Sequence, residues 1–266
     1  MKRYIPFVQG PPVVAVIRLT GSIGLGGRAS LSDNALRPVI ERAFRRGKPK
    51  AVALIINSPG GSPVQSALIA ARIRNLADKH KVAVHAFVED VAASGGYWLA
   101  AAADDIWADA GSIVGSIGVI SAGFGAHELL ARHGVERRVH TSGRSKSILD
   151  PFLPQKEEDV ELLKGLLEEM HSGFVSYVKQ RRGDKLGDEE DELFSGRFWL
   201  GGTACELGLI DGISHPEDKI RELYGDKAIL LRYGPRRSFL QRLSASVITD
   251  VMTDVEDRAA FARYGL

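Results

Sequence analysis

The chain has 266 residues, 44% of them hydrophobic, and its 35 basic and 33 acidic residues leave a formal net charge of +2. This length supports one domain with a substantial core, and the near balance of charge argues against nucleic acid as the main partner. Cys205 is the only cysteine, which excludes an intrachain disulfide and a thiolate metal cluster. No HExxH motif is present, so we expect no metal and no cofactor.

The first twelve residues carry two basic side chains but no long apolar region. We therefore interpret residues 1–12 as an N-terminal tail and not as a signal peptide. The longest uncharged stretch, residues 110–126, is rich in Gly and Ser and too short for a membrane span. The sequence predicts a cytoplasmic protein without a transmembrane segment.

Strand-like and helix-like patterns alternate along the chain. Apolar segments typical of strands are found at residues 13–19, 51–57, 82–88, 105–108 and 136–141. Segments with helical spacing are found at residues 33–46, 63–79, 126–133 and 156–181. This alternation predicts an α/β domain over residues 13–233 with largely parallel strand pairing.

Two apolar stripes have no obvious partner. The stripe on helix 156–181 is more typical of a core or a subunit interface than of a cofactor site; it consists of Leu162, Leu163, Leu166, Leu167, Met170 and Phe174. Residues 234–266 are predicted to form an amphipathic helical extension that packs on its own domain or on another subunit. A peripheral contact with a membrane surface is the alternative, although the polar face mixes basic and acidic residues.

Ser94 lies where an extended apolar segment changes to a helix-forming run. Residues 82–88 form the predicted strand, residues 99–103 favour a helix, and Gly95 and Gly96 follow the serine. A helix N-terminus favours negative charge and leaves backbone N–H groups unpaired, which suits a serine that attacks a carbonyl as an alkoxide. The alternative is a plain helix N-cap, for which serine is among the best residues.

The turn Asn-Ser-Pro-Gly-Gly at residues 57–61 ends a buried strand. Glycines let the backbone approach a ligand and turn its N–H groups toward an anion. The N–H groups of Gly95 and Gly61 are therefore candidate donors of an oxyanion hole, in which one donor contributes about 3 kcal/mol. The alternative is a tight strand-to-helix turn; a P-loop is excluded because no Gly-Lys-Ser/Thr follows.

Lys146 is the candidate general base. It lies in the polar loop 142–155 between Ser145 and Ser147, with apolar residues nearby. A lysine serves as a base only when its amine is neutral, and burial beside apolar groups favours the neutral form. Taken alone, a lysine in a polar loop is more often a solvated surface charge.

Four segments together resemble the signal peptide peptidase A and SohB-like serine peptidases. They are Ile-Ile-Asn-Ser-Pro-Gly-Gly at 55–61, Val-Ala-Ala-Ser-Gly-Gly-Tyr at 91–97, Gly-Ser-Ile-Gly-Val at 115–119, and Ser-Gly-x-x-Lys at 142–146 followed by Pro-Phe at 151–152. The resemblance covers roughly residues 13–220, and the order of the segments makes it specific. We expect a short single-domain form without the leading membrane anchor that many members have.

This resemblance implies a Ser/Lys dyad, with Ser94 as nucleophile and Lys146 as general base, and Gly95 and Gly61 as oxyanion donors. It implies a spiral of ββα units like that of the Clp protease and crotonase folds, and a ring-like homo-oligomer acting on peptides. In some members the serine and the lysine meet across a subunit interface. The Gly-rich segment 111–125, with Gly115 and Gly118, is expected to flank the substrate.

Three alternatives remain at this stage. A histidine could be the base, but His85 lies on a buried strand and His140 precedes the polar loop, and neither stands where the Clp protease has its histidine. An acyl-CoA enzyme of the crotonase type would share the fold, with Glu89 or Asp90 as its carboxylate. An inactive scaffold is the third, although Ser94 and Lys146 are both present.

Overall fold

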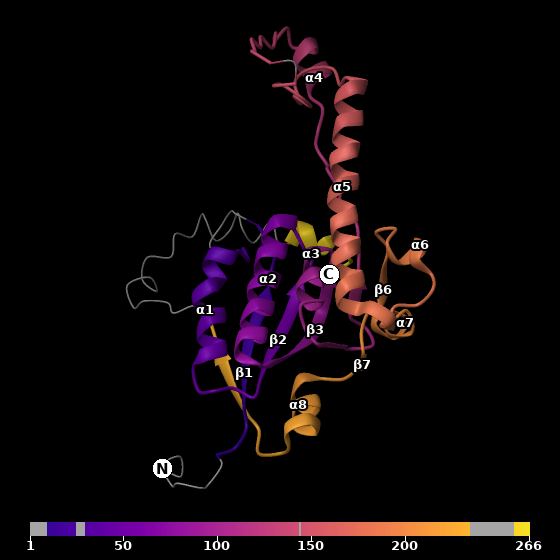
Figure 1. The fold of residues 1–266 in the computed structure, drawn as a ribbon. Helices are drawn as coiled ribbons and strands as arrows, with labels where there is room; N and C mark the ends of the chain where they lie inside the picture. The colour runs from indigo at the N-terminus through magenta and orange to yellow at the C-terminus, as the bar shows by residue number, and fades with distance from the viewer. Residues whose placement is uncertain (1–9, 25–29, 144, 235–257) are drawn as a thin grey trace.

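The computed structural model describes residues 10–24, 30–143, 145–234 and 258–266. Eight strands form one sheet in the order β6-β5-β3-β2-β1-β8, with β4 joined to β3 and β7 (Figure 1). The strands are β1 (Val13–Thr20), β2 (Ala51–Ser58), β3 (Ala83–Ala93), β4 (Asp105–Ala108), β5 (Ile113–Gly115), β6 (Phe198–Leu200), β7 (Gly212–Ile213) and β8 (Ile229–Tyr233). All pairs are parallel except β5 with β6.

The helices follow the strands in the predicted alternation. They are α1 (Asp33–Arg45), α2 (Pro63–His80), α3 (Gly95–Ala100), α4 (His127–Arg132), α5 (Glu157–Arg182), α6 (Glu190–Leu193), α7 (Gly201–Glu206) and α8 (Pro216–Tyr224). Ser32 caps α1 through its side chain, which accepts the N–H of Ala35 at 3.4 Å. The predicted α/β fold is confirmed.

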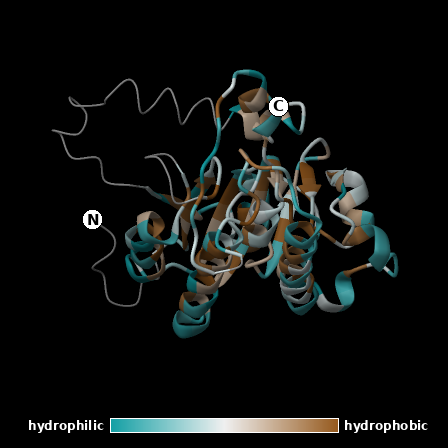
Figure 2. Ribbon diagram, turned by 90° about the horizontal axis from the view of Figure 1, so that it is seen from above, coloured by the Kyte–Doolittle hydropathy of each residue, from teal (hydrophilic) through white to brown (hydrophobic). Residues whose placement is uncertain are grey.

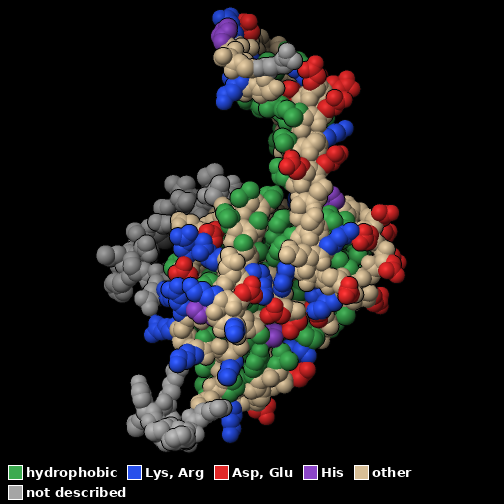
Figure 3. Space-filling model, viewed as in Figure 1, with side chains coloured by type: hydrophobic (Ala, Val, Ile, Leu, Met, Phe, Trp, Pro, Cys, Tyr) green, Lys and Arg blue, Asp and Glu red, His purple; other side chains and the backbone are tan. Residues whose placement is uncertain are grey.

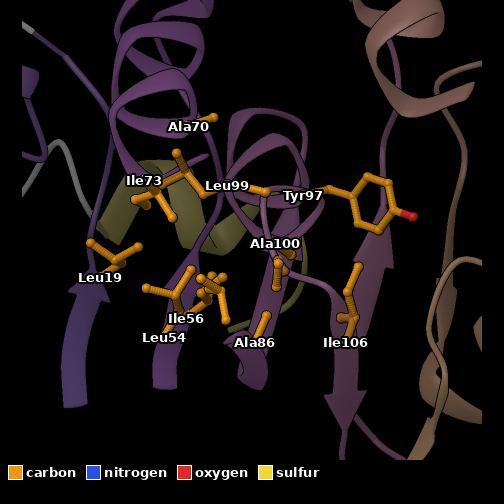
Figure 4. Packing of buried hydrophobic residues seen from close by; sticks show 14 of the residues in the cluster. Leu19, Leu54, Ile56, Ala70, Ile73, Ala86, Tyr97, Leu99, Ala100 and Ile106 are labelled. Atoms are coloured by element: carbon orange, nitrogen blue, oxygen red, sulfur yellow. The ribbon is translucent and has the colours of Figure 1, made fainter. Parts of the chain in front are cut away.

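The main core lies between the sheet and α1 to α3. Helix α1 buries residues at three- and four-residue spacing, from Leu36 to Phe44, against β1 and α2. Figure 4 shows Leu19, Leu54 and Ile56 of the sheet beneath Ile73 of α2 and Leu99 of α3. Seen from above, the apolar strands lie between helices whose outer sides are hydrophilic (Figure 2). Strand β2 is buried on both faces, as predicted for a central parallel strand.

The other face of the sheet is covered by α8 and by the C-terminal residues. Residues 258–262 are helical, and Phe261 and Tyr264 pack against Val91, Ala93 and Ile113. Most of the predicted amphipathic extension, residues 235–257, lies outside the described residues. No helix among the described residues combines the length and the apolar composition that a membrane span requires.

Helix α5 projects well beyond the sheet and carries α4 near its outer end (Figure 1). It has 26 residues, yet its buried residues are confined to the C-terminal third, at Phe174, Val178 and Arg182. We call the described residues of 119–170 the arm. The strand predicted at residues 136–141 is wrong: these residues have no regular secondary structure, because the arm offers them no strand to pair with.

Candidate active site

Ser94 forms the sharp turn between β3 and α3. Its φ of 52° and ψ of −119° place a non-glycine residue in a sparsely populated conformation, which costs on the order of 1–3 kcal/mol. Its side chain makes no capping hydrogen bond, and the residue is only half-buried. The interpretation of Ser94 as a plain side-chain cap is therefore wrong, and its hydroxyl is left for another use.

Strand β3 reaches this turn with a bend. It pairs with β4 through residues 85–88 and with β5 through residues 91–93. Between them the register with β2 shifts, from Ile56 opposite Val88 to Ser58 opposite Ala92. The amide of Asn57 donates to the carboxylate of Asp90 at 2.6 Å and holds this bulge. The bend carries the end of β3 away from β4 and onto β5, next to the nucleophile.

Gly60 lies directly against the nucleophile. A Cβ built on Gly60 would be 2.8 Å from the Cβ of Ser94, from the nitrogen of Gly95 and from the oxygen of Ala93. The φ of Gly60 is +99°, which other residues rarely adopt. The Gly-Gly turn thus brings a backbone segment against Ser94 that any side chain would push away.

Gly61 is placed by a short parallel bridge to Ile23. Ile23 donates to the carbonyl of Gly60 and accepts from the N–H of Ser62, both at 2.7 Å. Because successive backbone groups of an extended segment point to opposite sides, the N–H of Gly61 points away from Ile23. It donates to no described residue, and the N–H of Gly95, at the start of α3, has no acceptor within its helix.

The two glycines after the nucleophile are required by packing. A Cβ on Gly95 would collide with the hydroxyl of the buried Ser66, and one on Gly96 with the carbonyl of Ser58. Helix α3 therefore begins tightly against the end of β2 and the first turn of α2. This explains why the sequence Ser-Gly-Gly occurs at this point of the fold.

Lys146 does not reach Ser94 within the chain. Its side chain is exposed, in the loop between α4 and α5. That loop is fastened at the outer end of α5, where the N–H of Leu149 bonds to Asp159, while α3 lies at the sheet (Figure 1). No described Lys, His, Asp or Glu side chain hydrogen-bonds to the hydroxyl of Ser94.

The histidines predicted as alternatives are also away from Ser94. His85 is buried, and its two ring nitrogens contact Asp105 at 2.8 Å and Tyr224 at 2.7 Å, a satisfied core group. His140 is exposed in the arm. Sequence reasoning did not single out His171 of α5, whose Nε2 lies 3.2 Å from the carbonyl oxygen of Ile117. Its helical spacing to Phe174 was the only sequence signal that it faces the domain.

The carboxylates proposed for a crotonase-type site are already engaged. Glu89 forms an ion pair with Arg18 at 2.6 Å, and Asp90 accepts the amide of Asn57. Both belong to the bend of β3. They hold the strand that leads to Ser94, and they favour no separate carboxylate chemistry.

Gly115 is hydrogen-bonded to the nucleophile residue, and the backbone groups of Gly115 and Gly118 are partly used within the fold. The carbonyl of Gly115 accepts the N–H of Ser94 at 2.8 Å, and a Cβ on Gly115 would be 2.9 Å from the ring of Trp199. The N–H of Gly118 donates to Ser116 at 2.9 Å. Contact of these glycines with a substrate stays a prediction.

Trp98 links the nucleophile helix to α5, a contact that sequence reasoning missed. Its backbone N–H donates to the carbonyl of Ser94 at 3.0 Å. Its ring stacks on Phe174 with centroids 4.6 Å apart and on Tyr177 with centroids 5.0 Å apart. The partners come from two separate segments, so their meeting has no local sequence signal.

The sequence model of peptidase family S49 matches residues 76–229. The Na(+)/H(+) antiporter NhaA of Brucella abortus is 48% identical over 100% of this chain, which spans 39% of that protein. A protein of Haemophilus influenzae named probable protease SohB is 31% identical over 82% of this chain and 61% of its own.

A solved structure shares the fold. It is a mutant of the membrane-bound stomatin-specific protease 1510-N in complex with a substrate peptide. It covers 91% of this chain and 100% of its own, with a TM-score of 0.56 and 16% identity. The antiporter name describes a protein more than twice as long as the matched part, whereas the family match lies within the chain itself.

Proposed function

The chain belongs to the serine-type peptidases of family S49, and from this premise we propose that it hydrolyses peptide bonds with Ser94 as nucleophile and Lys146 as general base. The observation that carries the proposal is the strained turn at Ser94, whose side chain caps no helix and whose Cβ lies against Gly60 of the Gly-Gly turn. Strain of this kind is retained where the surrounding structure and function require it.

The proposed reaction runs through an acyl-enzyme. The neutral amine of Lys146 takes the proton of Ser94 as its oxygen attacks the scissile carbonyl. The N–H groups of Gly95 and Gly61 stabilise the oxyanion of the tetrahedral intermediate. The lysine then gives its proton to the leaving amine, and a water molecule, activated by the same amine, hydrolyses the ester.

Lys146 is proposed to come from a neighbouring subunit. A general base must lie within hydrogen-bond reach of the proton it takes, and within the chain the two residues are on separate parts of the fold. The arm that carries Lys146 projects away from its own domain, so it is suited to lie on another copy. Burial at such an interface would also favour a neutral amine.

The arm has the surface of an interface. Hydrophobic side chains alternate with charged ones along it (Figure 3). Several large exposed apolar side chains gathered on one projecting segment favour an interaction site. The exposed apolar residues of the arm are Ile120, Phe124, Leu129, Val135, Phe152, Leu162, Leu166 and Met170. We propose that copies of the chain cover these residues in a ring-like homo-oligomer.

The proposed substrate is an extended peptide or an unfolded segment with small or apolar side chains at the cleavage site. Support comes from the apolar surroundings of Ser94 and from the absence of regular structure in residues 116–126, which follow β5. A cytoplasmic location and the role of the C-terminal extension stay predictions.

Complementation between two inactive variants tests the shared site. Ser94→Ala retains Lys146, and Lys146→Ala retains Ser94, so each pure oligomer should be inactive. Subunits mixed under dissociating conditions and reassembled should regain peptidase activity, because some sites then combine an intact serine with an intact lysine. A dyad within one chain would give no recovery.

Covalent labelling provides the second test. A fluorophosphonate probe should label Ser94 in the assembled protein, and peptide mapping should find the label there. Labelling should be lost in Ser94→Ala and slowed in Lys146→Ala. Full peptidase activity in Ser94→Ala, or a label on another residue, would contradict the proposal.

A further inference from the structure

Helix α5 has two functionally different halves. The outer half belongs to the arm, and the inner half is fixed to the domain. The inner anchors are Arg181, which donates to the carbonyls of Ala101 and Ala103, and Arg182, which is buried and paired with Asp211. The fully packed anchor nearest to the arm is Phe174, which is 2% exposed and stacks on Trp98; His171, one turn earlier, is only partly buried.

Trp98 is stacked on two aromatic rings of α5. The interplanar angles are 20° with Phe174 and 17° with Tyr177, so each of these rings is nearly parallel to the Trp98 ring. Offset stacking of this kind restricts sideways rotation of one helix on the other. The hydroxyl of Tyr177 is buried and has no hydrogen-bond partner among the described residues. The contact of Tyr177 with Trp98 is therefore made by its ring.

The length of the arm amplifies any change at this point. Glu157 lies 17 residues before Phe174, which is about 26 Å along the helix. A tilt of about 10° at the stacked rings would move the outer end by about 4 Å over that length. A misplacement of about 1 Å at reacting groups can already lower a rate by about 100-fold.

We propose that Trp98 is a positioning residue for the peptidase reaction, acting through the arm of its own subunit. Its stacking on Phe174 and Tyr177 sets the direction of α5. That direction decides where Lys146 is presented to the Ser94 of the neighbouring subunit. The inference rests on the proposed shared dyad, and it assigns Trp98 to the subunit that supplies the lysine, although Trp98 lies four residues from its own Ser94.

The complementation system separates this role from a local effect on Ser94. In a mixture of Ser94→Ala and Lys146→Ala subunits, every active site takes its lysine from the first and its serine from the second. Trp98→Ala is added to only one of the two. In the lysine donor it should lower kcat by at least about tenfold with KM little changed, because the base is misplaced. In the serine donor the loss should be less than about twofold.

Conservative variants guard against loss of folding. Trp98→Phe keeps a ring against its partners and should restore most of the activity in the lysine donor. Tyr177→Ala should reproduce the loss of activity in the lysine donor, whereas Tyr177→Phe, which keeps the ring, should retain the activity. Trp107→Phe, at a tryptophan that packs with Ile220 of α8 and contacts Lys219, is the matched control and should leave kcat unchanged. Light scattering checks that every mixture has the mass of the unmodified oligomer.

The outcomes are distinct. Equal losses in the two donors, or a larger loss in the serine donor, would overturn the assignment of Trp98 to the arm. Failure of the parent mixture to recover activity, with Trp98 intact in both subunits, would instead refute the shared dyad. A donor-specific loss that Trp98→Phe relieves would establish the positioning role.

Discussion

The α-carbon of Gly60 packs so closely on Ser94 that a Cβ built on the glycine would lie 2.8 Å from the Cβ of the serine. The two residues follow the ends of neighbouring strands of the sheet, β2 and β3. Their contact fixes the distance between the nucleophile and the Gly-Gly turn. The backbone that follows β2 is therefore packed directly against the proposed nucleophile that follows β3.

Gly60→Ala should damage activity more than stability. The new methyl group would clash with Ser94 and with the nitrogen of Gly95. The φ of +99° is also unfavourable for alanine, so the turn must shift. We expect kcat/KM to fall by about 100-fold and the free energy of unfolding by about 1–3 kcal/mol. Gly202→Ala, which has no atom within 4 Å of its new Cβ, should change neither. Near-normal activity of Gly60→Ala would contradict the close contact.

Leu166→Glu should break the oligomer without unfolding the subunit. Leu166 is 46% exposed on the outer half of α5, where a charge would be buried only if another copy covers it. Light scattering should show a smaller mass than that of the unmodified protein. Peptidase activity should also be lost, because the neighbouring subunit no longer supplies Lys146. Urea unfolding of the subunit should change by less than about 0.5 kcal/mol. Glu168→Gln on the same helix is the control, and an unchanged mass for Leu166→Glu would exclude this surface from the interface.

Tyr97→Phe should destabilise the domain. The Tyr97 hydroxyl is fully buried and donates to the carbonyl of Leu209 at 2.8 Å, so its removal leaves a buried acceptor unpaired. We expect a loss of about 1–2 kcal/mol in the free energy of unfolding, measured with urea. Tyr177→Phe removes a hydroxyl that has no partner among the described residues and should cost close to nothing. Equal losses in the two variants would contradict the assignment.

Asp211 should contribute stability that is lost in acid. Burial raises the pKa of the Asp211 carboxyl, but hydrogen bonds from Arg182 and Lys185 outweigh burial and hold it below the usual 3.8. The carboxylate therefore stabilises the fold above about pH 4 and ceases to do so as the pH falls through its folded-state pKa. Asp211→Asn should flatten the fall in stability below pH 4.

The same variant leaves Arg182 without its charge partner. Arg182 has a side chain only 2% exposed, and a buried charge that loses its partner costs on the order of 3 kcal/mol at neutral pH. Asp226→Asn, at an exposed carboxylate with no described ion pair, should leave the pH dependence unchanged. Parallel stability curves for Asp211→Asn and the unmodified protein would refute the assignment.

Much of the fold follows from local patterns. Apolar segments predict β1, β2 and β4, and helical spacing predicts α1, α2 and α5, to within one or two residues; β3 runs five residues beyond its predicted end at residue 88. The order of elements then predicts parallel pairing. Residues 136–141 fail because a strand needs a partner edge, which local apolarity does not supply.

The sequence indicates candidate residues for the site but not their geometry. Ser94, Gly95 and the Gly-Gly turn stand together because they follow the ends of neighbouring parallel strands, which the sequence pattern predicts. That Ser94 adopts a positive φ, and that Gly60 touches it, depends on tertiary contacts between separate segments. The same is true of the stacking of Trp98 on Phe174 and Tyr177.

The bulge in β3 has a consequence for the number of residues that can precede Ser94. Between Ile56 opposite Val88 and Ser58 opposite Ala92, β2 advances by two residues and β3 by four. Side chains alternate between the two faces of a strand. Because the two extra residues of β3 are an even number, the residues after the bulge point to the same faces as they would without it. Removal of one residue from positions 89–90 would move the side chains of Ala92 and Ala93 each to the other face of the sheet. Removal of both residues would keep each side chain on its present face and shorten the bend. The tolerated lengths of this segment should therefore differ in steps of two.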